Sequence, residues 1–140
     1  MVKTFTLFAD KDALRLDVAE NGWAKLTLLG QNEVYLGADV IDRVCSRLVG
    51  YLTNEDVLGR ASAGEIDGHS VYCLLLLSEA HHALYVTGPG SESLLFWQNA
   101  RTSPVSIVGI MRLLPAQRQD WIQTLSRVME DAKKPSLVAA

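Results

Sequence analysis

The chain has 140 residues, of which 49% are hydrophobic and 21% are charged, and its net charge at neutral pH is −3. This composition is that of one globular domain, and it excludes the disordered and collagen-like classes. Residues 1–99 carry seven Lys/Arg against thirteen Asp/Glu, and residues 100–140 carry six against three, so neither part forms the strongly basic surface that nucleic-acid binding requires.

The opening segment "MVKTFTLFAD" is too short and too polar for a secretory signal peptide. No apolar run approaches the roughly 18 residues that a membrane-spanning helix needs. We therefore expect a cytoplasmic protein without a membrane partner. The two cysteines, Cys45 and Cys73, lie in apolar segments. Since no cysteine framework is present, we expect two buried free thiols.

The first part of the chain predicts a meander of antiparallel strands. Apolar and polar residues alternate over residues 13–19 and 23–29, which is typical of strands with one buried face. Asn21-Gly22 joins them, and Asn-Gly is the strongest short hairpin signal because both residues tolerate positive φ. Two further segments extend the sheet, 4–9 and 33–37, with turns at Asp10-Lys11 and Gly30-Gln31.

The period of the pattern then changes from two to that of a helix. Over residues 39–52 the apolar positions recur every three or four residues and form one stripe, with Asp39 as the expected N-cap. The stripe consists of Val40, Ile41, Val44, Cys45, Leu48, Val49 and Leu52.

A second group of strands is predicted after a hairpin turn at Asp67-Gly68. The segments are 70–77, 83–88, 93–97 and 105–114. Within them, "VYCLLLL" and "LLFW" do not alternate, which predicts apolar cover on both faces of these strands. The polar, glycine-rich segment 87–93 leads into a strand and not into a helix, so we interpret it as a turn and not as an anion site.

The chain closes with a second amphipathic helix over residues 115–130. Pro115 suits its first turn, and Trp121, Ile122, Leu125, Val128 and Met129 share one face. Residues 1–134 are predicted to form a single domain, and residues 135–140 a flexible tail.

These elements predict an α+β fold with a mostly antiparallel sheet of about eight strands, in the order four strands, helix, four or five strands, helix. Two helices, each about 20 Å long, cover only about one face of such a sheet. Either the N-terminal strands cover the other face, giving a sandwich or partly closed barrel, or a second protomer covers it. Both alternatives stay open, and a homodimer is one of them.

Histidines and a carboxylate gather near the end of the leucine-rich strand, at Glu79, His81 and His82, with His69 at the start of that strand. Imidazole and carboxylate groups are ordinary zinc ligands. Adjacent strand residues point to opposite faces, however, and His69 is about 25 Å away by strand rise. We therefore expect solvated histidines and no metal or other cofactor.

The segment "FWQNAR" is the best candidate for an interaction surface, because an aromatic side chain beside amides and an arginine is typical of binding surfaces. Its residues are Phe96, Trp97, Gln98, Asn99 and Arg101.

No catalytic motif is present: the sequence lacks G-x-S-x-G, C-x-x-C, H-E-x-x-H and the P-loop. We expect a small non-enzymatic protein-interaction or adaptor domain whose partner is a protein or a second copy of itself. The alternative is a small-ligand-binding or catalytic barrel, with a pocket between sheet and helices. That pocket would be lined from residues 71–77 and 105–111, with Glu79, His81 or Arg112 at its mouth.

Overall fold

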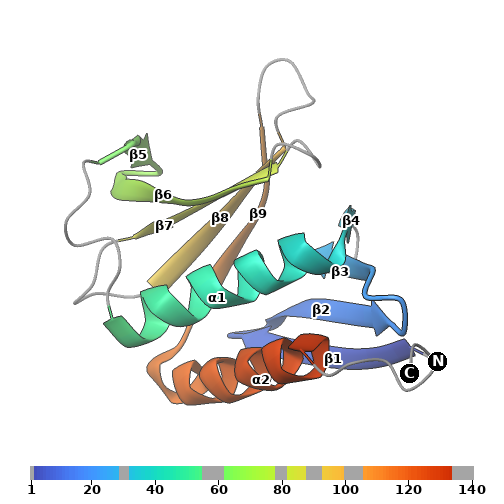
Figure 1. The fold of residues 1–140 in the computed structure, drawn as a ribbon. Helices are drawn as coiled ribbons and strands as arrows, with labels where there is room; N and C mark the ends of the chain where they lie inside the picture. Colours follow the sequence, from blue (N-terminus) through green and yellow to red (C-terminus); the bar gives the residue numbers. More distant parts are fainter. Residues whose placement is uncertain are drawn as a thin grey trace.

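The computed structural model describes residues 2–28, 32–54, 62–77, 82–87, 93–99 and 106–133. Within these residues the order is four strands, a helix, five strands and a second helix, which confirms the predicted α+β class and element order (Figure 1). The strands are β1 (Val2–Ala9), β2 (Asp12–Ala19), β3 (Ala24–Leu28), β4 (Asn32–Leu36), β5 (Gly64–Ile66), β6 (His69–Leu77), β7 (His82–Thr87), β8 (Ser93–Asn99) and β9 (Ser106–Leu113), and the helices are α1 (Ala38–Asn54) and α2 (Pro115–Lys133).

The strands form two antiparallel meanders and not one sheet. Sheet A has the order β1-β2-β3-β4, and sheet B has the order β5-β6-β7-β8-β9. In both sheets each strand pairs only with its neighbours in sequence, as expected where short turns join successive strands.

The turns at Asp10 and at Asp67-Gly68 follow the predicted chemistry, whereas at Asn21-Gly22 only the glycine has a positive φ. Asp10, in the β1–β2 turn, has φ 54°, and Asp67-Gly68, in the β5–β6 turn, has φ values of 51° and 80°, as a type I′ hairpin requires. Gly22 has φ 90°, and a Cβ there would lie 2.7 Å from the Cβ of Ala38 at the start of α1. The predicted turn at Gly30-Gln31 lies outside the described residues.

One hydrophobic core joins both sheets and both helices. The predicted stripe of α1 is buried, apart from the half-buried Val49, and Tyr51 adds to it. Asp39 lies in the first turn of α1 and not before it, because the amide of Ile41 already donates to the carbonyl of Gly37. The apolar stripe of α2 buries Trp121, Leu125 and Val128.

Helix α1 lies between α2 and sheet B in Figure 1 and is hydrogen-bonded to that sheet. Tyr51 donates its buried hydroxyl to the carbonyl of Thr87 at 2.9 Å, and Nε of Arg47 donates to the carbonyl of Leu74 at 3.2 Å. Since α1 follows sheet A in the sequence, these bonds tie the first half of the chain to the second.

Helix α2 makes the reciprocal connection, from the second half of the chain to sheet A. The indole of Trp121 donates to the carbonyl of Phe8 at 2.8 Å. The side-chain oxygen of Gln117 accepts from the amide of Asp10 at 2.8 Å and from the amide of Leu114 at 3.2 Å. These bonds join the end of β1 to the segment that follows β9.

A β-bulge explains most of the leucine run in β6. The pairing of β6 with β7 shifts between Cys73 and Leu75, and a bulge of this kind turns two successive side chains to the same face. Leu74, Leu75 and Leu77 therefore all enter the core, whereas Leu76 is 66% exposed. The prediction of apolar cover on both faces is wrong for these four residues.

In β8, by contrast, both faces are covered within the single chain. Leu95 and Trp97 belong to the core. Phe96, on the opposite face, is 1% exposed, and its ring centroid lies 6.5 Å from that of His69. A second protomer is therefore not required to bury this strand.

Among the described residues, neither helix is long and apolar enough to cross a membrane.

Candidate functional site

The outer face of sheet A is the candidate site. The inner face of sheet A carries the core residues of all four strands, which form one cluster with the apolar stripes of both helices. Because side chains alternate along a strand, every second residue belongs to the outer face. These residues are Val2, Thr4, Thr6 and Phe8 of β1, Ala13, Arg15, Asp17 and Ala19 of β2, Lys25 and Thr27 of β3, and Glu33 and Tyr35 of β4.

Three large apolar side chains are exposed together at one end of this face. Val2 is 56% exposed, Trp23 57% and Tyr35 65%. They surround a shallow hollow of about 440 Å³, which is also lined by Ala19, Ala24, Asp17 and Lys25. Scattered single hydrophobic residues are normal on a surface, but several around one hollow mark a binding site.

The β2–β3 hairpin holds Trp23 in place. The amide of Trp23 donates to the side-chain oxygen of Asn21 at 3.1 Å, and its carbonyl accepts from the amide of Ala19 at 2.8 Å. The Asn21-Gly22 pair that permits the tight turn thus also fixes the backbone of the exposed tryptophan. Because the backbone of Trp23 is already fixed, binding through this residue does not have to order the hairpin.

A network of opposite charges lies beside the hollow. One carboxylate oxygen of Asp17 lies 3.1 Å from Nε of Arg15 and 4.0 Å from Nζ of Lys25. The other carboxylate oxygen of Asp17 accepts a 2.6 Å hydrogen bond from the hydroxyl of Thr4. Lys25 also lies 3.1 Å from Glu33. The hydrogen bond from Lys25 to Glu33, followed by their charge attraction, raises the pKa of Lys25, so this lysine stays charged at neutral pH.

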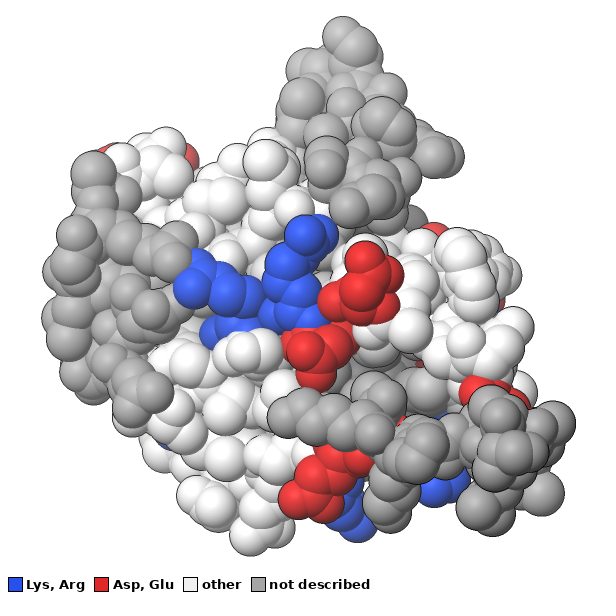
Figure 2. All heavy atoms as spheres, in the orientation of Figure 1, with Lys and Arg blue, Asp and Glu red and all other residues white. Residues whose placement is uncertain are grey.

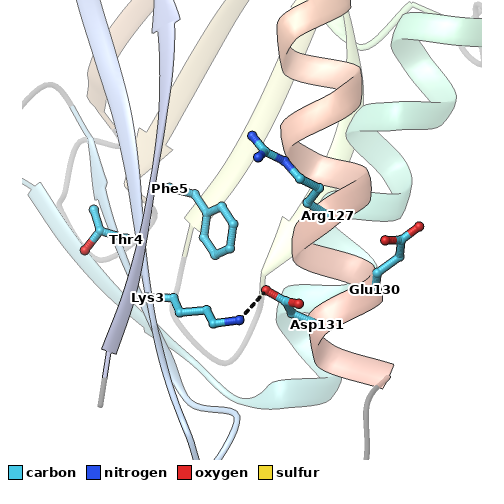
Figure 3. A pocket seen from close by; sticks show the side chains of 6 residues that line it. All are labelled: Lys3, Thr4, Phe5, Arg127, Glu130 and Asp131. Atoms are coloured by element: carbon cyan, nitrogen blue, oxygen red, sulfur yellow. Dashed lines mark hydrogen bonds and ion pairs between the residues drawn. The ribbon is translucent and has the colours of Figure 1, made fainter.

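A second hollow, of about 410 Å³, lies between β1 and α2 (Figure 3). Lys3 and Phe5 point from β1 toward the helix, whereas Thr4 points to the opposite side of the strand. Lys3 pairs with Asp131 at 3.1 Å across the hollow. Two basic and two acidic residues contribute to its lining, since Arg127 and Glu130 also belong to it. It therefore offers no excess charge to attract an ionic ligand.

The predicted surface at residues 96–101 is partly inside the molecule. Phe96 is 1% and Trp97 0% exposed, so neither side chain is available to a partner in this conformation. Gln98 and Asn99 are half-buried at the end of β8. Arg101 lies outside the described residues. The structure thus leaves only Gln98 and Asn99 partly accessible within the described part of this segment.

Of the candidate metal ligands, His69 is exposed and His82 is half-buried, while Glu79 and His81 lie outside the described residues. Within the described part of the chain, no three His, Cys, Asp or Glu side chains are grouped as a metal site would need. Arg112, which we placed at the mouth of a possible pocket, is exposed on β9.

Among the described residues, β6 and β9, from which the alternative ligand pocket would be lined, contribute side chains to the core. Leu74, Leu75 and Leu77 from β6 and Met111 and Leu113 from β9 are each at most 3% exposed and belong to the core cluster.

The two cysteines are free thiols in different surroundings. Cys45 is buried in α1, and burial, followed by the charge of Asp42, raises the pKa of its thiol from 9.0 to about 12. Cys73 is half-buried, not fully buried as predicted. Since the thiolate is the nucleophile, Cys45 has no reactive character at neutral pH.

Charges of both signs are mixed on the face that Figure 2 shows. Lys and Arg side chains gather near its middle, and Asp and Glu side chains lie directly beside them.

The residues around the apolar hollow have a sequence signal of their own. Tyr35 lies two residues after Glu33, at a position where the alternating pattern of its strand predicts a polar residue. Val2 lies two residues before Thr4, in the same alternating series as Thr4 and Thr6. An apolar residue at a position whose alternation calls for a polar one marks an exposed patch. No protein-family model matches this chain, and no curated protein is similar to it.

Proposed function

We propose that this protein is a small, cytoplasmic, non-enzymatic protein-interaction domain and that the outer face of sheet A is its contact surface. The observation that carries the proposal is the group of Val2, Trp23 and Tyr35, each more than half exposed, around one hollow.

The energetics of this surface favour a protein partner. An aromatic side chain offers about 150–250 Å² of contact area, of which Trp23 still exposes 57%. At about 25 cal/mol per Å², covering the exposed part of this ring would contribute about 2–4 kcal/mol. Tyrosine and tryptophan are enriched among the few residues that dominate interface energies. The charged residues beside them match the polar rim that surrounds such anchors.

The electrostatics do not favour catalysis at this place. Asp17, Lys25 and Glu33 are paired with one another. A lysine that acts as a base or nucleophile needs a lowered pKa, and the pKa of Lys25 is raised.

Site-specific photo-crosslinking in cells tests the proposal. A photoreactive phenylalanine analogue replaces Tyr35 in one variant and Leu76 in a matched variant, because both side chains are about two-thirds exposed but lie on different sheets. We expect position 35 to yield a discrete crosslinked protein and position 76 to yield none. The mass of the product then tells whether it contains a second copy or another protein.

The absence of any crosslink from position 35, with the variant folded, would contradict the proposal. A product from position 76 alone would place the contact surface on sheet B.

A further inference from the structure

The pairing of the strands arranges the charges of the outer face in rows that run across sheet A. Thr4 lies opposite Asp17, Asp17 opposite Lys25, and Lys25 opposite Tyr35. The row across β1, β2, β3 and β4 therefore reads Thr4, Asp17, Lys25, Tyr35. Its two charges, of opposite sign, are on the two central strands.

This order is complementary to itself under a two-fold rotation. Two such faces can meet about a two-fold axis that is parallel to the strands and lies between β2 and β3. The strand order of the partner is then reversed across the interface, and each row of residues faces the same row of the partner. Asp17 then faces the partner's Lys25, and Lys25 faces the partner's Asp17. In a symmetric dimer each favourable contact occurs twice.

The neighbouring row fits the same operation. Thr6 lies opposite Arg15, Arg15 opposite Thr27, and Thr27 opposite Glu33. The rotation brings Arg15 over the row position of the partner's Thr27, whose side chain is itself buried at 7% exposure, and Glu33 to the partner's Thr6. No like charges therefore face each other in either row.

The apolar hollow lies at the same end of the face in both copies. Trp23, in the turn between β2 and β3, lies next to the axis. The rotation therefore places it against the partner's hollow beside the partner's Ala19. Two sheets that pack face to face are about 10 Å apart, with interdigitating side chains, which is a separation that an inserted indole and a lysine can bridge.

We propose that the partner at this surface is a second copy of the chain, an inference that rests on the proposed function. Two copies associate through the outer faces of sheet A, about a two-fold axis parallel to the strands, with Asp17 paired to the partner's Lys25. The other two-fold axis in the plane of the interface, perpendicular to the strands, would pair Asp17 with the partner's Arg15 instead. That arrangement would leave the hollow of each copy facing the end of the sheet that carries Phe8.

The register of the two faces is tested by reversing single charges and measuring the association of the variants by sedimentation velocity at micromolar concentration. Lys25→Glu places Glu against the partner's Asp17, and Asp17→Lys places Lys against the partner's Lys25. We expect each variant alone to associate at least tenfold more weakly than the wild type. An equimolar mixture of the two should associate again, because both contacts are then between opposite charges. Arg112→Glu makes the same change of charge on the exposed β9 of sheet B and should change the dissociation constant less than threefold. Arg15→Glu also breaks the 3.1 Å pair of Arg15 with Asp17 in its own chain, and it should weaken association less than Lys25→Glu does.

The double variant Asp17→Lys/Lys25→Glu keeps an opposite pair across β2 and β3 but places like charges beside Arg15 and Glu33, so its far-ultraviolet circular dichroism is first compared with that of the wild type to show that it folds. It should associate with itself like the wild type and should not mix with wild-type chains, as measured by energy transfer between labelled copies. Free mixing of these two proteins would overturn the inference, as would a mixture of the single variants that stays dissociated. Greater sensitivity to Arg15→Glu than to Lys25→Glu would overturn it in favour of the perpendicular axis.

A wild-type chain that stays monomeric at 100-fold higher concentration would also overturn this inference. It would leave the proposed function intact if position 35 crosslinks to a different protein, and the two failures are therefore distinguishable.

Discussion

Trp121 of the last helix donates its indole N–H to the carbonyl of Phe8 at the end of the first strand, over 2.8 Å. The ring is fully buried, as the stripe of α2 predicted. This bond and the burial of the ring connect two segments that are 113 residues apart. They hold sheet A on α2, with Val2, Phe8 and Tyr35 of its outer face exposed.

We expect Trp121→Ala to lower the free energy of unfolding by about 3–5 kcal/mol, the usual cost of emptying a fully buried aromatic site. Trp121→Phe retains much of the ring but leaves the Phe8 carbonyl without this donor, and should cost about 1–3 kcal/mol. Urea unfolding measures both values. A loss near zero for Trp121→Ala would show that α2 does not pack on sheet A.

The bulge in β6 predicts opposite results for two adjacent leucines. Leu75→Ala should cost about 2–5 kcal/mol, because Leu75 is 3% exposed in the core. Leu76→Ala should change the stability by less than about 0.5 kcal/mol, because its side chain is 66% exposed. Equal losses at both positions, in the same unfolding assay, would contradict the bulge.

Trp97→Glu should unfold the protein and not merely separate its copies. Trp97 is 0% exposed and belongs to the core, so the substitution would bury a charge without a partner, at a cost above about 4 kcal/mol. Gln98→Glu, at the half-buried next position, is the matched control and should leave the far-ultraviolet circular dichroism unchanged. A folded Trp97→Glu variant would return this residue to the candidates for a contact surface.

Cys45 should make stability fall with pH in the alkaline range. Its pKa is raised by burial from 9.0 to about 12 in the folded chain, so above pH 9 the unfolded state releases a proton that the folded state keeps. The protonated thiol of Cys45 therefore makes its full contribution to the free energy of unfolding below pH 9. That free energy falls by about 1.4 kcal/mol per pH unit as the pH rises toward 12.

The variant Cys45→Ala lacks this thiol and serves as the reference for that measurement. Between pH 9 and 10 its free energy of unfolding should decline less steeply than that of the wild type. Identical slopes would mean that Cys45 is not buried as described.

Local chemistry made much of the fold predictable. Asp67-Gly68 forms the hairpin turn that its φ preferences indicate, and Gly22, but not Asn21, takes a positive φ in the turn between β2 and β3. Periodicity of two and of 3.6 also separated strands from helices in the correct order. These signals depend on neighbours in sequence, and they therefore survive without knowledge of the tertiary structure.

The bulge at Cys73/Leu75 could not be predicted in this way, because no turn residue or break in the apolar run marks it. Nε of Arg47, from α1, donates to the carbonyl of Leu74 at that point, and no local pattern reveals such a contact. Without the bulge, the leucine run implied two covered faces and an excess of apolar strand. Trp97 was predicted to belong to an interaction surface because amides and an arginine follow it, but the structure places it in the core.

The candidate site was only partly predictable for a similar reason. Alternation shows that Tyr35 and Lys25 share a face, but it does not show whether a helix covers that face. The exposure of Trp23 depends on how its hairpin packs against the start of α1, where Gly22 meets Ala38.

The most direct test of the contact surface is hydroxyl-radical footprinting of the protein in cells and as a dilute purified chain. We expect Trp23 and Tyr35 to be labelled strongly in the dilute chain and at least threefold more weakly in cells, because a partner covers them there. Leu76, exposed on the other sheet, should be labelled equally in both samples, and the buried Trp121 weakly in both. Equal labelling of Trp23 and Tyr35 in cells and in dilute solution would contradict the outer face of sheet A as a contact surface.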